Sequence, residues 1–325
     1  MASEKIEKLN MVGAINQALA EEMAADSSVV ILGEDVGADG GVFRVTQGLL
    51  EKFGPERVID TPLAELAIVG SAVGMSLYGL KPVAEIQFMG FIYEALEQVF
   101  SHACRMRSRS RGRFSCPLVI RTPYGIGIKA PELHSESTEA IFTHFPGLKV
   151  VVPSNPYNAK GLLKAAIRDP DPVIFLEPSR LYRAIRTEVP TDDYTVELGR
   201  ASVIQEGKAL TVVAWGAMVK TASEAAEGYD AEIIDLMTLK PYDEDAILKS
   251  VKKTGRLVIA EEASRICAFG AEISAFVSER AFGHISAPVI RVSAPDAVTP
   301  MARLEEHFRP SVERIKKAFD AVLSY

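Results

Sequence analysis

The stretch DTPLAELAIVGSAVGMSLYGLKPVAEIQF, residues 60–88, decides the fold class of this 325-residue chain. Its first half, from about residue 62 to residue 77, is a run of small and apolar residues that predicts a helix. Its second half, residues 81–88, is typical of a short buried strand. A helix that leads directly into a buried strand indicates an α/β fold, in which helices cover both faces of a mostly parallel sheet.

The same alternation continues on both sides of this stretch. Upstream, apolar residues at helical spacing follow a candidate helix cap at Asn10, and residues 27–35 are typical of a buried strand that ends in acids. Downstream, residues 91–107 predict a helix and residues 116–122 a strand. After a loop rich in glycine and proline come a strand, a helix and a strand, expected over residues 148–153, 158–169 and 172–177.

A change of composition divides the chain in two. Residues 178–197 are polar, carry two prolines and predict a linker, so we place a domain boundary near Pro190. A second series of strands and helices follows and ends in a helix after Pro310. We therefore predict two doubly wound α/β domains, over residues 1–189 and 190–325.

Composition excludes several classes of function. A net charge of −7 argues against nucleic acid as the main partner. Cys104, Cys116 and Cys267 are far apart and form no Cys-x-x-Cys pair, and the five histidines lack metal-ligand spacing. The charged opening segment is unlike an export signal, and no run of eighteen apolar residues predicts a membrane span. We expect a cytoplasmic protein.

Glu65 is the first candidate functional residue, because it stands at the head of an apolar run. A carboxylate carried into an apolar interior costs several kcal/mol unless a partner compensates it. In the first turn of a helix, the free backbone N–H groups would stabilise its charge. Alternatively, it is a buried carboxylate that makes a charge-assisted hydrogen bond with a ligand nitrogen.

Two further segments have a plain and a functional interpretation. His134 lies between acids and serines in the glycine-rich loop, where it is a general acid or base or simply faces solvent. Five arginines alternate over residues 105–113 and would align on one side of an extended chain. Such a row fits a solvated or subunit-facing surface better than a nucleic-acid site in a chain of this charge.

Five segments together resemble a known family. They are GEDVGADGGVFRVTQGLLEKFG, DTPLAE, KPVAEIQF, HSESTEAIFTHFPGLKVVVPSNPYNAKGLLKAAIRDPDPVIFLEP and APDAVTP. In this order and spacing they resemble the beta subunit of the decarboxylating component of 2-oxoacid dehydrogenase complexes. The resemblance implies a transketolase-like fold, with a pyrimidine-binding domain followed by a transketolase C-terminal-like domain. It also implies thiamine diphosphate as cofactor and a 2-oxo acid as substrate, either pyruvate or a branched-chain acid.

The resemblance implies roles for particular residues. Glu65 would hydrogen-bond a ring nitrogen of the cofactor's aminopyrimidine, and low dielectric would strengthen that bond. Phe91 would stack on the pyrimidine and Leu63 would line it. Glu34 matches an acid in a polar tunnel that links two active sites, and Gln87 matches a glutamine near the substrate. His134 matches the histidine that orients intermediates and helps acyl transfer to lipoyl.

The family pattern also implies a cation site and partners. Backbone carbonyls of Leu118 and Val119 with the Asp169 side chain would hold potassium, although Asp169 also suits a plain turn between prolines. The Gly-Asp-Gly motif that binds magnesium and diphosphate in single-chain relatives is missing. This chain would therefore pair with an alpha subunit that holds magnesium, as two alpha and two beta subunits. Its second domain would pair the beta subunits and dock the lipoyl acyltransferase core.

Other functions remain open on the sequence alone. An acetoin dehydrogenase beta subunit fits the same resemblance. A self-sufficient transketolase is disfavoured by the missing diphosphate motif and the short length. A non-catalytic assembly subunit is disfavoured because it has no physical reason to retain a costly carboxylate beside an apolar run.

Overall fold

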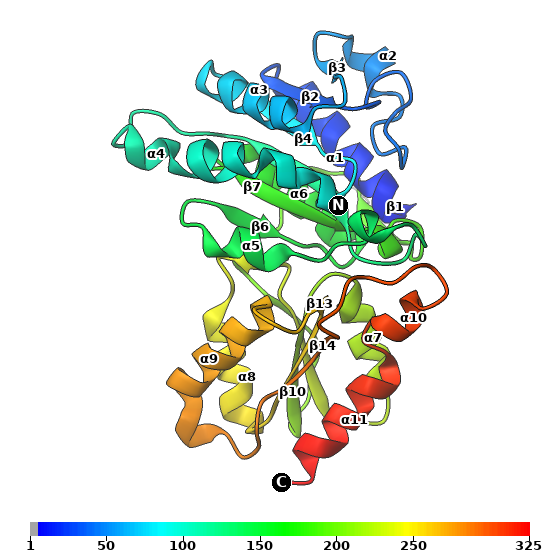
Figure 1. Ribbon diagram of the computed structural model, residues 1–325, viewed down its shortest axis with the longest axis vertical. Coiled ribbons are helices and arrows are strands. Elements are labelled where there is room, and N and C mark those ends of the chain that lie inside the picture. Colours follow the sequence, from blue (N-terminus) through cyan, green and yellow to red (C-terminus); the bar gives the residue numbers. More distant parts are fainter. Residues whose placement is uncertain (1–5) are drawn as a thin grey trace, which may run out of the picture.

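The computed structural model describes residues 6–325, and Figure 1 shows two layered α/β domains stacked end to end. The first domain is built on a seven-stranded sheet in the order β12-β6-β7-β5-β4-β2-β3, in which every pair is parallel except β12 with β6. Its strands are β2 Val29–Gly33, β3 Val58–Asp60, β4 Lys81–Glu85, β5 Val119–Tyr124, β6 Lys149–Val151, β7 Val173–Pro178 and β12 Thr238–Lys240.

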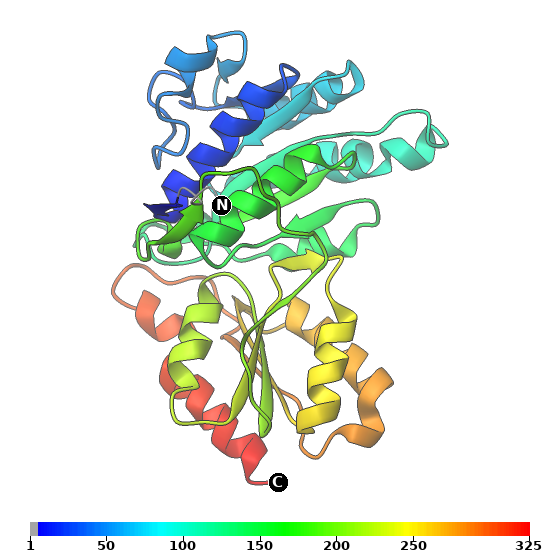
Figure 2. The same ribbon diagram turned by 180° about the vertical axis from the view of Figure 1, so that it is seen from behind.

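Helices cover both faces of this sheet, as the continuous apolar strands require. Helices α1 (Met11–Ala25) and α6 (Pro156–Arg168) pack together on one face, which Figure 2 shows. Helix α3 (Glu65–Leu77), a helical segment over residues 89–109 and α5 (Glu139–His144) cover the other. Short α2 (Leu49–Phe53) precedes β3. Asn10 caps α1 as predicted, because its Oδ1 accepts from the Gly13 N–H at 2.9 Å.

The second domain repeats the plan on a smaller sheet in the order β14-β13-β10-β11-β9, in which only β9 is antiparallel. Helices α7 and α11 pack on one face and α8 and α9 on the other (Figure 1). The elements are β9 Ser202–Gln205, β10 Leu210–Ala214, α7 Ala217–Ala225, β11 Ala231–Asp235, α8 Glu244–Thr254, β13 Leu257–Ser264, α9 Phe269–Ala281, β14 Ile290–Ala294, α10 Glu305–Phe308 and α11 Val312–Leu323. The predicted fold class is confirmed.

The connection between the domains is more structured than a linker. Residues Thr187–Pro190 form β8, which pairs antiparallel with β1 (Ile6–Leu9) in a separate two-stranded sheet. Strand β12 leaves the second half of the chain and adds an edge strand to the first domain's sheet. The large sheet therefore contains six strands from the first domain and one strand, β12, from the second half of the chain, and this shared sheet joins the two domains.

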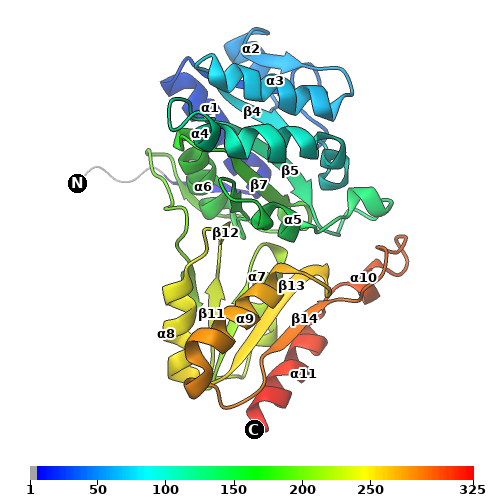
Figure 3. The same ribbon diagram turned by 60° about the vertical axis from the view of Figure 1, so that its left-hand side comes forward.

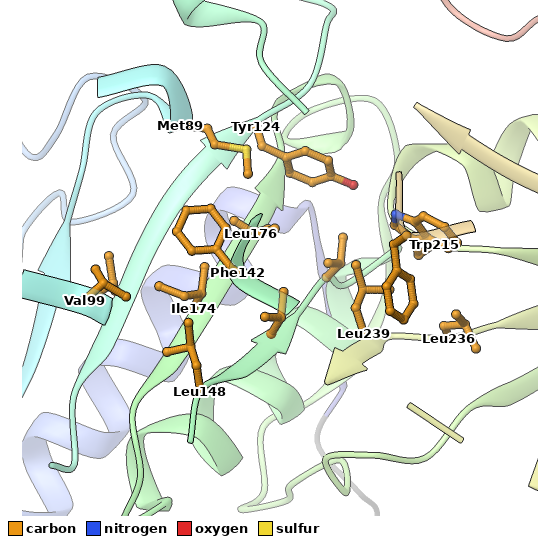
Figure 4. Packing of buried hydrophobic residues seen from close by; sticks show 14 of the residues in the cluster. Met89, Val99, Tyr124, Phe142, Leu148, Ile174, Leu176, Trp215, Leu236 and Leu239 are labelled. Carbon is orange, nitrogen blue, oxygen red and sulfur yellow. The ribbon is translucent and has the colours of Figure 1, made fainter. Parts of the chain in front are cut away.

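One hydrophobic core crosses the joint between the domains. Figure 4 shows Phe142, Ile174 and Leu176 of the first domain packed in the same cluster as Trp215, Leu236 and Leu239. All six side chains are at most 1% exposed. Burial of this kind stabilises by roughly 25 cal/mol for each Å² removed from water, so the two domains form a single packed body.

The helix predicted over residues 91–107 is irregular. A 3₁₀ segment (Met89–Ala95) is followed by a π segment (Gln98–His102), a 3₁₀ turn (Ala103–Arg105) and a short α-helix, α4 (Met106–Arg109). A π segment places an extra residue in a turn and shifts the register of the side chains that follow. Apolar periodicity reports which face is buried and does not report such a shift.

The row of arginines is wound rather than extended. Arg105, Arg107 and Arg109 lie in helical turns, and Arg111 has a left-handed φ of 54°. The five side chains therefore do not align on one side. Arg107 instead pairs with Asp171, with Nε 2.6 Å from the carboxylate oxygen. Within residues 6–325, no helix is both long and apolar enough to cross a bilayer.

Candidate functional site

Six of the predicted site residues follow the carboxyl ends of four strands of the large sheet. Glu34 follows β2, Leu63 and Glu65 follow β3, Gln87 and Phe91 follow β4, and His134 lies in the loop after β5. The loops at this edge are seen to the right of the upper domain in Figure 3. Ligands of open α/β sheets bind outside the carboxyl ends of the strands. The fold thus brings together residues up to 100 positions apart in the chain.

Glu65 lies at the start of a helix and is also buried. It is the first residue of α3, whose cap residue Ala64 offers no side-chain hydrogen bond. Its side chain is nevertheless buried, at 5% exposure. The dipole of a 13-residue helix stabilises a negative charge at this end and offsets part of the cost of burying the carboxylate.

Glu34 lies close enough to Glu65 to be affected by its charge. Burial, together with the carboxylates of Glu65 and Asp35, raises the pKa of Glu34 to about 7. Its Oε1 is buried and has no hydrogen-bond partner within residues 6–325. A buried carboxyl group with a pKa of about 7, such as that of Glu34, can gain or lose a proton near neutral pH.

His134 is packed between two aromatic rings. Its imidazole centroid lies 4.4 Å from that of Phe88 and 5.1 Å from that of Phe91. The two rings also meet edge to face at 5.5 Å. The buried Nδ1 of His134 has no hydrogen-bond partner among the described residues. The side chain is half-buried, so it is neither enclosed in the core nor fully exposed to solvent.

Sequence reasoning missed Gly90. Because this residue has no side chain, the loop that carries His134 can pack closely against the 3₁₀ segment. A Cβ at this position would lie 2.4 Å from the carbonyl oxygen of Leu133 and 2.9 Å from its Cα. Real Cβ atoms do not approach backbone so closely, so only glycine lets the 3₁₀ segment and the loop touch. The only sequence signal was a glycine directly after the strand and among bulky residues.

Sequence reasoning also missed two polar supports of the site. Asp60, at the end of β3, accepts backbone N–H groups of Gly37 and Ala38 at 2.6 and 3.0 Å and fixes the loop that follows Glu34. Beneath the edge, Arg121 bonds both oxygens of Glu177 at 2.7 Å and also contacts Glu85. The residue types alone do not reveal that Asp60 and Arg121 support the site.

Gln87 is half-buried and donates to Asp35 at 3.2 Å. Asp35 has a left-handed φ of 57°, which turns the chain sharply directly after Glu34. Non-glycine residues in this conformation are uncommon and concentrate at functional turns. The contact joins the loops after β2 and β4 across the site.

The three residues of the implied cation site lie away from this edge. Leu118 and Val119 stand at the start of β5, and Asp169 precedes β7, so they are at the amino ends of the strands. The Leu118 carbonyl accepts the Val173 N–H at 2.9 Å. Asp169 pairs with the Lys149 ammonium at 2.5 Å and accepts the Asp171 N–H at 2.9 Å. In this arrangement Lys149 already supplies Asp169 with a positive charge.

Helix α3 presents an open face next to the acids. Leu63 and Tyr78 are 81% and 90% exposed, and Leu66 is 49% exposed. Gly74 on the same face has no atom within 4 Å of the place of a Cβ. Exposed apolar side chains that lie together on one face can form a contact surface for another chain. Leu63 therefore lines an open surface.

Among residues 6–325, no three histidine, cysteine or acidic side chains gather as a metal site would need. Cys104 and Cys116 are buried and Cys267 is exposed, and all three are free thiols.

Comparison with known proteins relates the whole chain to one group. Residues 7–185 match the family described as transketolase, pyrimidine binding domain, and residues 199–315 match transketolase, C-terminal domain. The pyruvate dehydrogenase E1 component subunit beta of Acholeplasma laidlawii is 52% identical over 94% of this chain and 95% of its own length. The protein of the same name from Bacillus subtilis is 46% identical over 98% and 99%.

Solved structures support the same fold. A split-gene transketolase, described as an inactive beta4 tetramer, superposes with a TM-score of 0.79 at 27% identity, covering 98% of this chain and 99% of its own. Transketolase from Leishmania mexicana superposes with a TM-score of 0.70 at 18% identity, over 98% of this chain and 46% of its own. The second likeness concerns the fold alone.

Proposed function

Because this chain belongs to the family of pyruvate dehydrogenase E1 component beta subunits, built from the two transketolase domains, we propose that it is the beta half of a thiamine diphosphate-dependent 2-oxo acid dehydrogenase. The proposed substrate is pyruvate, the acid in the relatives' names. The observation that carries the proposal is the buried pair Glu34 and Glu65 at the carboxyl edge, beside a helix face left open for a second chain.

The residues present fit the pyrimidine half of the cofactor. Glu65 is a buried carboxylate at the site's edge, Phe91 offers a half-buried ring, and the buried Oε1 of Glu34 has an unused hydrogen-bonding position. When bound, the cofactor supplies an electron sink for the electron pair left by decarboxylation. Glu65 would hold a proton on a ring nitrogen, and the proximity of Glu34 favours sharing that proton near neutral pH.

His134 is placed to act on the substrate side. Its Nδ1 has no partner in the described chain, and Phe88 and Phe91 fix the ring plane. An imidazole with one free ring nitrogen can hydrogen-bond and so orient an oxygen of a bound 2-oxo acid, and a histidine that carries an extra proton can donate it to that oxygen. We propose that it does so, and that it assists transfer of the acyl group to a lipoyl arm. Magnesium and diphosphate would be held by an alpha subunit.

A direct experiment tests the proposal. The chain is co-expressed with candidate alpha subunits that contain a Gly-Asp-Gly motif, and the purified assembly is assayed for oxidation of a panel of 2-oxo acids with a dye acceptor. We expect turnover that requires thiamine diphosphate and is fastest with pyruvate. Preference for a branched-chain acid or acetoin would correct the substrate. An assembly that turns over none of these compounds would refute the proposal.

Gly90→Ala should impair the reaction by displacing the histidine loop. The added methyl would meet the Leu133 carbonyl at 2.4 Å, so the loop must move. Misplacement of a reacting group by about 1 Å can cost about 100-fold in rate, and we expect a loss of that order. Gly283→Ala, at a position with no atom within 4 Å, is the control and should keep full activity. Equal rates for both variants would show that the contact is unimportant.

Gly74→Leu should separate folding from assembly. The exposed helical position has room for a larger side chain, and leucine favours the helix by about 1 kcal/mol over glycine, so the isolated chain should stay folded. A partner that packs closely on α3 would be excluded. Size-exclusion chromatography with the alpha subunit should then show loss of the complex. Lys252→Leu, on an exposed position of α8, is the control. Normal assembly of the Gly74 variant would place the partner elsewhere.

A further inference from the structure

The loop that carries His134 is closed at its base by a single backbone contact. It leaves β5 after Tyr124 and enters α5 at Glu139, and the Gly125 N–H donates to the Glu136 carbonyl at 2.8 Å. Between these points the chain makes only one short 3₁₀ turn, Glu132–His134. Besides the packing of His134 on Phe88 and Phe91 and the approach of Leu133 to Gly90, the position of the imidazole therefore depends on what holds the two ends of the loop.

The first end is held from the other domain by Glu262. This residue lies in β13 and is 5% exposed. A Cβ at Gly125 would lie 2.7 Å from Glu262 Oε2, so the carboxyl group rests directly against the glycine backbone, whose φ is +80°. The Ile126 N–H donates to the same carboxyl group. Glu262 thus fixes the first two residues of the loop.

The second end is held by a matching contact across the joint. Glu139, fully buried at the start of α5, accepts from the Trp215 Nε1–H at 3.0 Å. Figure 4 shows Tyr124 directed toward Trp215 from the other side. Both ends of the loop are therefore tied to the second domain through a glutamate.

Between these two ties the loop and the second domain are not in close contact. A cavity of about 270 Å³ separates them, lined by Ser135, Ser137, Cys267 and Val298 among others. The buried hydroxyl groups of Ser135 and Ser137 have no hydrogen-bond partner within residues 6–325. The contacts described between the loop and the second domain thus lie at the ends of the loop.

We propose that Glu262 is a positioning residue, which acts from the second domain through the base of the loop to hold His134 in its reactive place. The inference rests on the proposed function for its kinetic consequence. The structural part of the proposal, that Glu262 keeps the loop closed, can be tested in the isolated chain.

The contact between Glu262 and the first residues of the loop should depend on pH, because several charged groups surround it. Glu262 faces Arg180 and Arg309, which favour its ionised form, and Glu139 and the Tyr124 hydroxyl, which do not. Burial outweighs the arginines and raises the pKa of Glu262 to about 7. Burial, with the charge of Glu261, raises the pKa of Glu139 to about 7 against the opposing bond from Trp215.

The sign of the pH effect follows from these directions. A carboxyl group whose pKa is raised by folding binds its proton more tightly in the folded state, so the tie is favoured at low pH and weakens as pH rises through about 7. Above that pH, two adjacent buried carboxylates would repel each other. The loop should open more often at pH 8 than at pH 6.

Trypsin cleavage after Lys129, which is exposed within the loop, measures the opening in the isolated chain. We expect Glu262→Ala to be cleaved about tenfold faster than the unaltered chain, because cleavage reports the population of the open form. Glu262→Gln keeps an acceptor for the Ile126 N–H and should be cleaved slowly at every pH. Glu279→Ala, an exposed position on α9, is the control. Cleavage of the Ala variant at the unaltered rate would overturn the proposal.

The assembled enzyme provides the kinetic test. We expect Glu262→Ala to lower kcat about tenfold with little change in KM, and Glu262→Gln to restore it. In a His134→Ala background the Glu262 substitution should have no further effect, since coupled residues are non-additive. A further tenfold loss in that background would overturn the positioning role. If the unaltered assembly shows no 2-oxo acid activity, the proposed function fails while the cleavage result still decides whether Glu262 holds the loop.

Discussion

Replacing Glu65 with glutamine is expected to abolish thiamine-dependent turnover of a 2-oxo acid while leaving assembly with the alpha subunit intact. Glutamine has the same shape and keeps the packing of this buried position. It cannot carry the negative charge that would hold a proton on a ring nitrogen of the cofactor. Acid–base groups contribute about 100-fold to 10,000-fold, so we expect a loss of at least about 100-fold in kcat.

The isolated chain offers a second measurement on the same variant. The charge of Glu65 is one cause of the raised pKa of Glu34, so the pKa of Glu34 should fall below about 7 when that charge is removed. Carbon NMR of the glutamate carboxyl groups would detect the shift. This readout requires neither cofactor nor partner and tests the pairing of the two acids directly.

Glu56→Gln provides the control for both measurements, because Glu56 is exposed and lies away from the apolar run. It should leave turnover and the Glu34 titration unchanged. A Glu65→Gln assembly that turns over at the normal rate would remove Glu65 from the chemistry. Its place at the head of α3 would then be explained by helix-end stabilisation alone.

Replacing Arg121 with methionine should produce the largest loss of stability. Arg121 is 1% exposed and lies between Glu85 and Glu177, whose side chains are at most 6% exposed. Although burial alone would lower the pKa of Arg121, the two carboxylates raise it above its ordinary value. Methionine fills similar space but leaves two buried carboxylates without a positive charge. Breaking such a network costs about 3–5 kcal/mol in the free energy of unfolding.

Urea unfolding of the isolated chain measures this loss. Arg107→Met is the matched control, because Arg107 pairs with Asp171 at the surface, with side chains 46% and 29% exposed. An exposed pair of this kind contributes little to stability, so the control should unfold near the unaltered midpoint. Adding Glu177→Gln to Arg121→Met should recover part of the loss by removing one buried charge. Equal midpoints for the two methionine variants would show that the buried network does not stabilise the fold.

The network also connects stability to the site. Glu85 ends β4, two residues before Gln87, and the Tyr182 hydroxyl donates to Glu177 at 2.6 Å. These groups lie near the carboxyl ends of β4 and β7, the same edge of the sheet that carries Glu34, Glu65 and His134. A variant that loosens them is therefore expected to lose activity as well as stability, unlike Glu65→Gln.

The sequence by itself determined the class of the fold, because burial patterns are local. Apolar strands alternate with helices of suitable period, and side chains such as Asn10 mark where helices begin. The same local logic predicted a helix from about residue 62, and α3 begins at Glu65. It erred over residues 89–109, where apolar periodicity cannot reveal π and 3₁₀ turns.

Only the tertiary structure decided which segments far apart in the chain come into contact. Parallel strands carry Glu34, Glu65 and His134 to one edge from distant positions, and the resemblance to a family named these residues without placing them. The structure alone gave the partners of Arg121, the close approach at Gly90 and the tie of Glu262 to the histidine loop. These contacts join residues far apart in the chain, and a local pattern carries no information about which distant backbone will lie against it.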